Sequence, residues 1–212
     1  MSPWCLRWVR RTALLFLLLV SGLAAAEDRL IVIVPMGPVD AAFLETAKQT
    51  LSERLNATVR IDPEVPLLKA AWYAPRKRYR AEKILDGLQP SIAPDAWKTM
   101  VITSVEISTT KGDVKDWGIA GLGNIGGNIS VASTSLYTRY SKSKDQAVQR
   151  FGQVVIHEFG HTLGLEHCEV PTCAMADFKG KAMTAADKGG RQYCLKCRTR
   201  VTGAVLKDWA VK

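Results

Sequence analysis

Histidine is scarce in this sequence. The 212-residue chain contains three histidines, and all three lie between positions 157 and 167. The chain also lacks internal repeats and low-complexity tracts, which argues against a repeat architecture. A catalytic or metal-binding role for histidine is therefore confined to one short window.

The chain lacks the patterns of a nucleic-acid-binding protein, although its formal net charge is +9 at pH 7. The positive residues are spread along the chain, and the densest run, residues 76–80, is predicted to cover the solvent face of a helix. No aromatic-interleaved platform or recognition motif accompanies that run. We therefore expect no nucleic-acid partner.

The N-terminal apolar run, residues 13–23, is short for a membrane span. It follows Arg7, Arg10 and Arg11 and precedes three alanines at residues 24–26, a layout typical of a secretory signal peptide. We predict that residues 1–26 are removed and that residues 27–212 form one exported domain, periplasmic or secreted, with no stable membrane insertion. An uncleaved segment would instead tether the protein to the membrane.

A glycine-rich stretch, residues 121–126, spells the dinucleotide fingerprint G-x-G-x-x-G. That fingerprint requires a helix directly after the loop, where the helix N-terminus receives a pyrophosphate. A strand pattern follows here instead. We interpret the stretch as a flexible glycine loop and expect no nucleotide.

Strand and helix patterns alternate along the chain. Runs of aliphatic or β-branched residues predict strands, whereas apolar residues three and four apart predict helices. The expected strands cover residues 29–35, 58–62, 98–109 and 128–137, and the expected helices cover residues 40–54, 77–88, 145–164 and 191–209. The alternation indicates an α/β layer with a largely parallel sheet, and the last strand is expected to be half-exposed or at an edge.

The window around the histidines contains the spacing H-E-x-x-H. On a helix, His157 and His161 would lie on one face, about 6 Å apart along the axis, within reach of a common zinc ion. Glu158 would project beside them, where it could take a proton from a water molecule. Gly164 permits the turn that ends the helix, so His167 can fold back as a third ligand.

Three neutral imidazoles leave a fourth coordination position open, as a catalytic zinc requires. The pattern therefore predicts hydrolysis without a covalent intermediate, with Glu158 as the general base. The alternative, histidines buried with ordinary hydrogen bonds, does not explain this spacing or the lack of histidine elsewhere.

Four cysteines remain after Cys5 leaves with the signal peptide. They form two short-spaced pairs about 20 residues apart, which match a zinc site built from four thiolates: Cys168 with Cys173, and Cys194 with Cys197. Disulfides are the alternative, because exported proteins usually pair their cysteines. We favour zinc, and pairing across the two pairs remains open.

These motifs together resemble a known family. The pattern H-E-x-x-H-x-x-G-x-x-H, continued by C-x(4)-C-x-M and a later C-x-x-C, is similar to the signature of the archaemetzincins, a family of the metzincin clan of zinc metallopeptidases. The segment between Met175 and Cys194 is one residue longer than the family usually shows.

The resemblance implies a zincin- or metzincin-like α/β (α+β) fold, with a twisted, mostly parallel sheet packed on helices, an active-site helix and a small C-terminal subdomain. It implies a peptidase with restricted, partly aminopeptidase-like activity and two zinc ions per chain. Met175 would be the apolar floor under the histidines, and residues 128–137 would form the upper rim of the cleft. The site residues would be His157, His161 and His167 for the catalytic zinc, Glu158 as base, and Cys168, Cys173, Cys194 and Cys197 for the structural zinc.

We therefore predict a monomeric, exported metallopeptidase that acts on peptides or proteins. The second hypothesis is a zinc-containing peptide-binding module with little or no turnover. The presence of Glu158 favours the enzyme, because a binding module has no need of a base.

Overall fold

The computed structural model describes residues 29–201 and 205–207. The predicted signal peptide therefore lies outside the described residues. Within the described ranges, none of the helices combines the length and apolar character needed to cross a bilayer.

A five-stranded sheet forms the centre of the molecule. Its order is β2-β1-β5-β9-β8, and all neighbours are parallel except β8, which runs antiparallel to β9. The strands are β1 (Leu30–Met36), β2 (Thr58–Ile61), β5 (Lys98–Thr103), β8 (Gly121–Gly123) and β9 (Ile129–Ser133). This confirms the mostly parallel sheet that the alternating pattern predicted.

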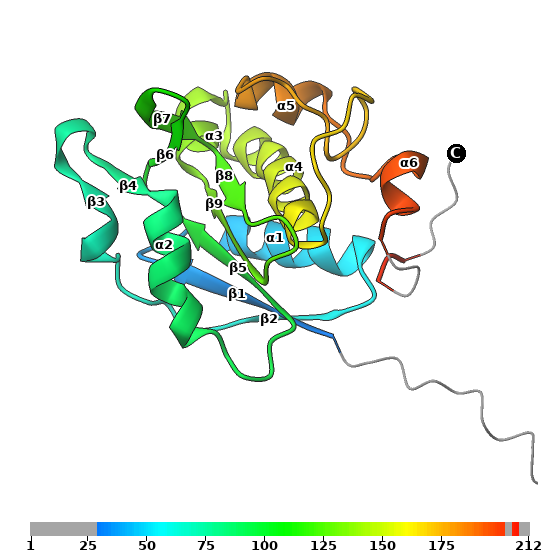
Figure 1. Cartoon of the computed structure of the whole chain (residues 1–212), viewed down its shortest axis with the longest axis horizontal. Helices are drawn as coiled ribbons and strands as arrows, with labels where there is room; N and C mark the ends of the chain where they lie inside the picture. Colours follow the sequence, from blue (N-terminus) through cyan, green and yellow to red (C-terminus); the bar gives the residue numbers. More distant parts are fainter. Residues whose placement is uncertain (1–28, 202–204, 208–212) are drawn as a thin grey trace, which may run out of the picture.

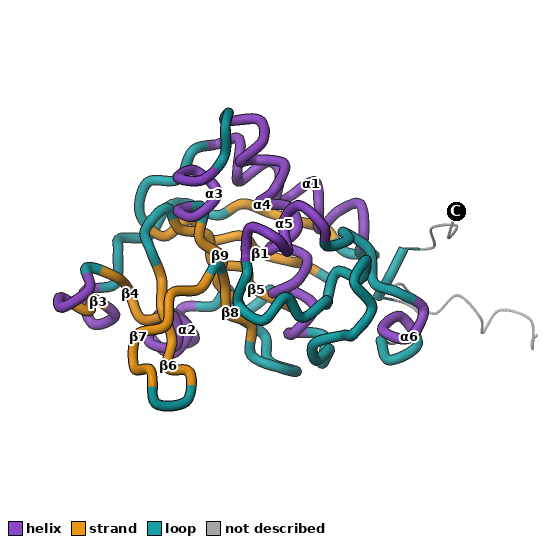
Figure 2. The backbone as a smooth tube through the Cα atoms, turned by 90° about the horizontal axis from the view of Figure 1, so that it is seen from above, coloured by secondary structure: helices purple, strands orange, loops and turns teal. Residues whose placement is uncertain are grey.

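Helices cover both faces of this sheet (Figures 1 and 2). The helices α1 (Ala41–Arg54) and α4 (Lys144–Thr162) pack against one face, and α2 (Ala81–Leu88) packs against the other. Alternate strand residues supply the two cores, because successive side chains of a strand point to opposite faces. Thus Ile102 lies in the core with α1 and α4, whereas Val101 lies in the core with α2.

A second, four-stranded sheet has the order β3-β4-β6-β7. It consists of β3 (Trp72–Tyr73), β4 (Arg78–Arg80), β6 (Ile107–Lys111) and β7 (Val114–Ile119). Short 3-10 turns lie at Lys69–Ala71, Ala74–Arg76 and Gln89–Ser91. In Figure 1 the β6–β7 hairpin lies near α3 (Ser135–Tyr140).

Two sequence-based boundaries in this region were wrong. The helix expected from residue 77 begins at Ala81, because Arg78 belongs to a strand in which it pairs with Glu106 and Asp116. The single strand expected over residues 98–109 is two strands in different sheets. The chain turns between them, where the Ser104 hydroxyl donates to the Pro38 carbonyl at 2.8 Å.

The strand expected over residues 128–137 was also corrected. It ends at Ser133, and α3 follows. All five residues of β9 are buried, because β9 lies between β5 and β8 and not at an edge. Its hydroxyls find partners in the interior: Ser133 Oγ donates to the Val105 carbonyl at 2.6 Å.

The segment after α4 forms a small C-terminal subdomain that carries two short helices, α5 (Ala182–Lys188) and α6 (Leu195–Arg198). The single helix expected over residues 191–209 was wrong, and α5 was not predicted. Near the C-terminus the backbone is extended: the Asn56 amide donates to the Val205 carbonyl at 2.8 Å, and Leu206 bridges to Leu55. These contacts with the end of α1 replace the hydrogen bonds of a helix.

Candidate active site and metal centres

The three histidines converge at the C-terminal end of α4. His157 and His161 lie one turn apart on the helix, which ends at Thr162. Gly164 then adopts a φ of +84°, in the left-handed region, and its amide donates to the His161 carbonyl at 2.9 Å. The chain turns back and brings a ring nitrogen of His167 within 4.8 Å of ring nitrogens of the other two.

Hydrogen bonds orient two of these rings. His157 Nδ1 lies 2.8 Å from the Ala174 carbonyl, and His161 Nδ1 lies 2.7 Å from the Leu165 carbonyl. A carbonyl only accepts, so each Nδ1 carries the proton and each Nε2 keeps its lone pair for a metal. Burial lowers the pKa of His157 to about 4 and also lowers the pKa of His161, which keeps both rings neutral at pH 7. This donor set fits zinc.

Glu158 lies beside the histidines in the same cavity and is 7% exposed. Burial raises the pKa of its carboxyl to about 8, and the backbone N–H of Gly123 donates to it. A carboxyl group with a pKa raised by burial thus lies next to the candidate zinc ligands, which suits a group that takes and returns a proton.

The glycine stretch, which we interpreted as a flexible loop, is instead the edge strand β8 and its following turn. A Cβ on Gly121 would lie 2.4 Å from Glu158 Cγ, and a Cβ on Gly123 would lie 2.3 Å from the Glu158 carbonyl oxygen. Only glycine permits this approach of the strand to α4. Glycines at alternate positions of a short strand were the sequence signal for such a contact.

Lys98 was not singled out from the sequence. Its Nζ donates to the Gly127 carbonyl at 2.6 Å and to the Thr162 carbonyl at 2.9 Å. It thus joins the turn after β8 to the last residue of α4, where a cation also interacts favourably with the helix dipole. The Gly126 amide adds a bond to the His161 carbonyl at 2.8 Å.

Met175 is fully buried beneath α4. A Cβ on Gly160 would lie 2.3 Å from its Sδ, so the thioether packs directly against the helix between the two histidine positions. The Met175 carbonyl accepts from the Cys168 amide at 2.7 Å. This hydrogen bond holds the residue after His167 next to the methionine.

The four predicted cysteine ligands also come together. Their sulfur atoms all lie within 4.8 Å of one another, and none is in a disulfide. The Cys168–Cys194 and Cys173–Cys197 sulfur pairs are each 3.7 Å apart. Because Zn–S bonds of about 2.3 Å in a tetrahedron place the sulfurs about 3.8 Å apart, this geometry fits a zinc ion. The amides of Met175 and Cys194 both point at Cys173 Sγ, which stabilises a thiolate.

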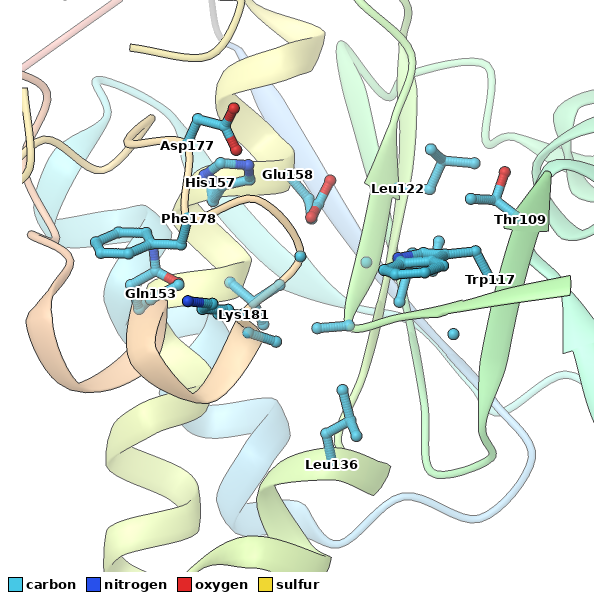
Figure 3. Close-up of a pocket in the computed structure, with 18 of the residues that line it drawn as sticks. Thr109, Trp117, Leu122, Leu136, Gln153, His157, Glu158, Asp177, Phe178 and Lys181 are labelled. Carbon is cyan, nitrogen blue, oxygen red and sulfur yellow. The ribbon is translucent and has the colours of Figure 1, made fainter. Parts of the chain in front are cut away.

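A cavity of about 410 Å³ opens in front of His157 and Glu158. Its walls come from α3, α4, the β6–β7 hairpin, β8 and residues 176–185. Figure 3 shows Glu158 and Trp117 pointing into the cavity from opposite sides, with Phe178 and Lys181 on the side of α5. The site thus combines a donor set that fits a metal ion, a buried carboxyl group and a cleft.

Comparisons with known proteins agree with this arrangement. The profile of Peptidase family M54 matches residues 54–202. The archaemetzincin of Halobacterium salinarum is 30% identical over 176 residues, which cover 80% of this chain and 97% of that protein. The archaemetzincin of Haloarcula marismortui is 31% identical over 153 residues, which cover 68% and 83%.

Solved structures show the same fold. The archaemetzincin of Archaeoglobus fulgidus, complexed with malonate, superposes with a TM-score of 0.67 at 24% identity and covers 81% of this chain and 99% of that one. A zinc-dependent peptidase from Methanocorpusculum labreanum superposes with a TM-score of 0.67 at 21% identity, over 81% and 100% of the two chains. These likenesses confirm the predicted fold class.

Proposed function

The chain belongs to the archaemetzincins, peptidase family M54, and is a zinc metallopeptidase; from this premise we propose that His157, His161 and His167 hold the catalytic zinc and that Glu158 is the general base. The observation that supports this proposal is that the three histidines and Glu158 lie close together. Three imidazole nitrogens lie within 4.8 Å of one another, and Glu158 lies in the same cavity as His157.

When bound, zinc supplies a Lewis acid that acidifies the attacking water and polarises the scissile carbonyl. The protein supplies the proton transfers. Glu158 takes the proton of the water as the oxygen attacks, holds it because its pKa is raised by burial, and delivers it to the departing amine. The Gly123 amide fixes the direction in which the carboxylate points.

We propose a second, structural zinc at Cys168, Cys173, Cys194 and Cys197. The separations of 3.7 Å between sulfur atoms support it, and so do the amides that point at Cys173. Cys168 directly follows His167, so a metal there would fix the chain that carries the third histidine ligand. Met175 would serve as the floor of the catalytic site, in keeping with its position against Gly160.

We propose that the enzyme is exported and acts as a monomer on peptide or protein substrates. The basic residues, apolar run and small residues of positions 1–26 support export. N-terminal sequencing of the mature protein tests cleavage, and light scattering tests the oligomeric state. A mature protein that retains residues 1–26 would point to membrane tethering.

A peptide library with mass-spectrometric detection tests the proposed chemistry. The zinc-loaded protein should cleave peptides, a chelator should stop cleavage, and Glu158→Gln should lower kcat by a factor of roughly 10² to 10⁴ while zinc stays bound. Glu166→Gln, at an exposed position, is the matched control and should keep full activity. Binding of peptides without any cleavage would instead support the peptide-binding module.

A further inference from the structure

One end of the cleft is closed by a contact between two segments distant in sequence. Trp117, on β7, lies against Gly180, because a Cβ on that glycine would be 3.2 Å from Trp117 Cζ2. Gly180 has a φ of +80°, which favours glycine. The β6–β7 hairpin and the segment before α5, which both line the cavity, therefore meet at its wall.

The edge strand β8 defines the path of an extended substrate. An extended peptide can pair with the free edge of a sheet, and the β8 edge passes directly beside Glu158 at Gly121. If the peptide runs antiparallel to β8, the part after the scissile bond lies towards Trp117. Trp117 precedes Gly121 by four positions, a span of roughly 13 Å in an extended chain. The closed end thus leaves room for about four substrate residues at most after the scissile bond.

The closed end is positively charged. Lys111 Nζ lies 5.0 Å from the centre of the Trp117 ring, which holds the ammonium group over the cavity. Lys181, which follows Gly180, lines the opposite wall, and in Figure 3 its amine points towards Gln153 and away from Trp117. Within residues 29–201 and 205–207, neither lysine has a carboxylate at ion-pair distance.

The acidic residues of the cavity lie elsewhere. Its two carboxylates are Glu158 and Asp177, and Figure 3 shows both near His157. Asp177 already accepts a hydrogen bond from the Lys179 amide at 2.7 Å. No negative charge of the cavity lining therefore neutralises the end formed by Lys111 and Trp117.

We propose that this closed end binds the C-terminal carboxylate of the substrate through Lys111, so that the enzyme releases short C-terminal fragments from peptides. The inference rests on the proposed peptidase function. It names the substrate class as peptides with a free carboxylate within about four residues after the scissile bond.

The test uses one library of short peptides made in three forms: free at both ends, amidated at the C-terminus, and acetylated at the N-terminus. Binding to the zinc-loaded Glu158→Gln protein is measured by calorimetry, and kcat/KM is measured with the wild type. We expect amidation to weaken binding and to lower kcat/KM about tenfold, as for the loss of one hydrogen bond between charged groups. Acetylation should change either value less than about twofold.

Lysine variants test which side chain causes the preference for free acids over amides. Lys111→Met should reduce the preference for free acids to about twofold or less, whereas Lys181→Met should leave most of the preference in place, because the Lys181 amine points away from Trp117. Lys115→Met removes the same charge from the same hairpin at an exposed position outside the cavity, and it should leave the preference intact. Circular dichroism and melting curves establish that each variant is folded.

Three results would overturn the inference. These are equal binding of acids and amides, a preference that survives Lys111→Met, and a loss caused by N-terminal acetylation instead of amidation. The last result would show that the site recognises the amino end of the substrate. A preference for acids in the binding experiment without cleavage by the wild type would refute the peptidase function and leave the carboxylate site standing.

Discussion

The backbone N–H of Gly123 donates a hydrogen bond to the carboxylate of Glu158. The edge strand β8 and the helix α4 thus share the residue that acts on the attacking water in the proposed mechanism. Because the strand approaches so closely at Gly121, where a Cβ would meet Glu158 and none of the histidines, a change of that glycine should act on catalysis without touching a proposed zinc ligand.

Gly121→Ala tests the close approach of β8 to Glu158. The new methyl group would lie 2.4 Å from Glu158 Cγ, so either the carboxylate or the strand must move. We expect kcat to fall by roughly 10² or more, the scale of a misplaced general base. Zinc content should stay at the wild-type level, because the histidines are not displaced. Zinc analysis and steady-state kinetics check both statements, and unchanged kcat would contradict the placement of Glu158.

Lys98 is expected to position the end of α4. Lys98→Met removes both hydrogen bonds to the Gly127 and Thr162 carbonyls, at a cost of about 1–3 kcal/mol in the free energy of unfolding. We also expect weaker zinc binding at the three histidines, since Thr162 lies between His161 and the turn to His167. Competition with a chromogenic chelator measures that affinity.

Two further variants serve as controls for the effect of Lys98→Met. Lys98→Arg keeps a cation with several donors and should restore part of the stability and zinc affinity. Lys83→Met, on the exposed face of α2, should behave as the wild type. Equal losses in the variants at positions 98 and 83 would show that Lys98 has no special role.

The stability of the metal-free protein should depend on pH through Glu158 and His157. Burial raises the pKa of Glu158 from 4.5 to about 8, so the folded state binds more protons than the unfolded state in that range and loses stability as pH rises. Burial lowers the pKa of His157 from 6.5 to about 4, so its contribution rises with pH up to about 6.5. Of these two groups, only Glu158 changes its contribution to stability above that pH.

Urea unfolding of the metal-free protein tests whether stability falls or rises with pH. The free energy of unfolding should fall between about pH 6.5 and pH 8 in the wild type, and Glu158→Gln should remove this decrease. A decrease of the same size in the variant would assign it to other groups.

The cysteine cluster predicts a defined metal and thiol count. The folded protein should hold two zinc ions and four thiols that react only after metal removal. Cys197→Ala should release the second zinc, lower the melting temperature and weaken zinc binding at the histidines, because Cys168 adjoins His167. A single zinc with no reactive thiols after chelation would establish disulfides instead.

The sequence predicted the features that depend on local spacing. The interval between His157 and His161 and the glycine at 164 specify how the helix presents its ligands and where it ends. The aliphatic run of β1 likewise indicates a buried parallel strand whatever its neighbours are. These inferences needed only the helical and strand periodicities.

The features that the sequence analysis missed depend on pairing between distant segments. The glycines of β8 were interpreted as a loop because three residues form too short a pattern to identify a strand, and their role depends on the proximity of Glu158. β9 was expected to be half-exposed or at an edge because its alternating hydroxyl residues suggested exposure, whereas the Ser133 hydroxyl donates to the Val105 carbonyl in the interior. Lys98 gave no signal, because its two acceptors are carbonyl groups that any residue could supply.

The connection between Cys168 and the last part of the chain has a consequence for biosynthesis. The segment that carries His167 contacts groups that emerge later from the ribosome. The Met175 carbonyl accepts from the Cys168 amide, and the sulfur atoms of Cys194 and Cys197 lie within 4.8 Å of the Cys168 sulfur. The Tyr193 hydroxyl donates to the Ile156 carbonyl at 2.9 Å and so connects the segment before Cys194 to α4. We therefore expect the nascent chain to complete its active site only after its C-terminal part has emerged, so that the peptidase would be inactive while it is being made.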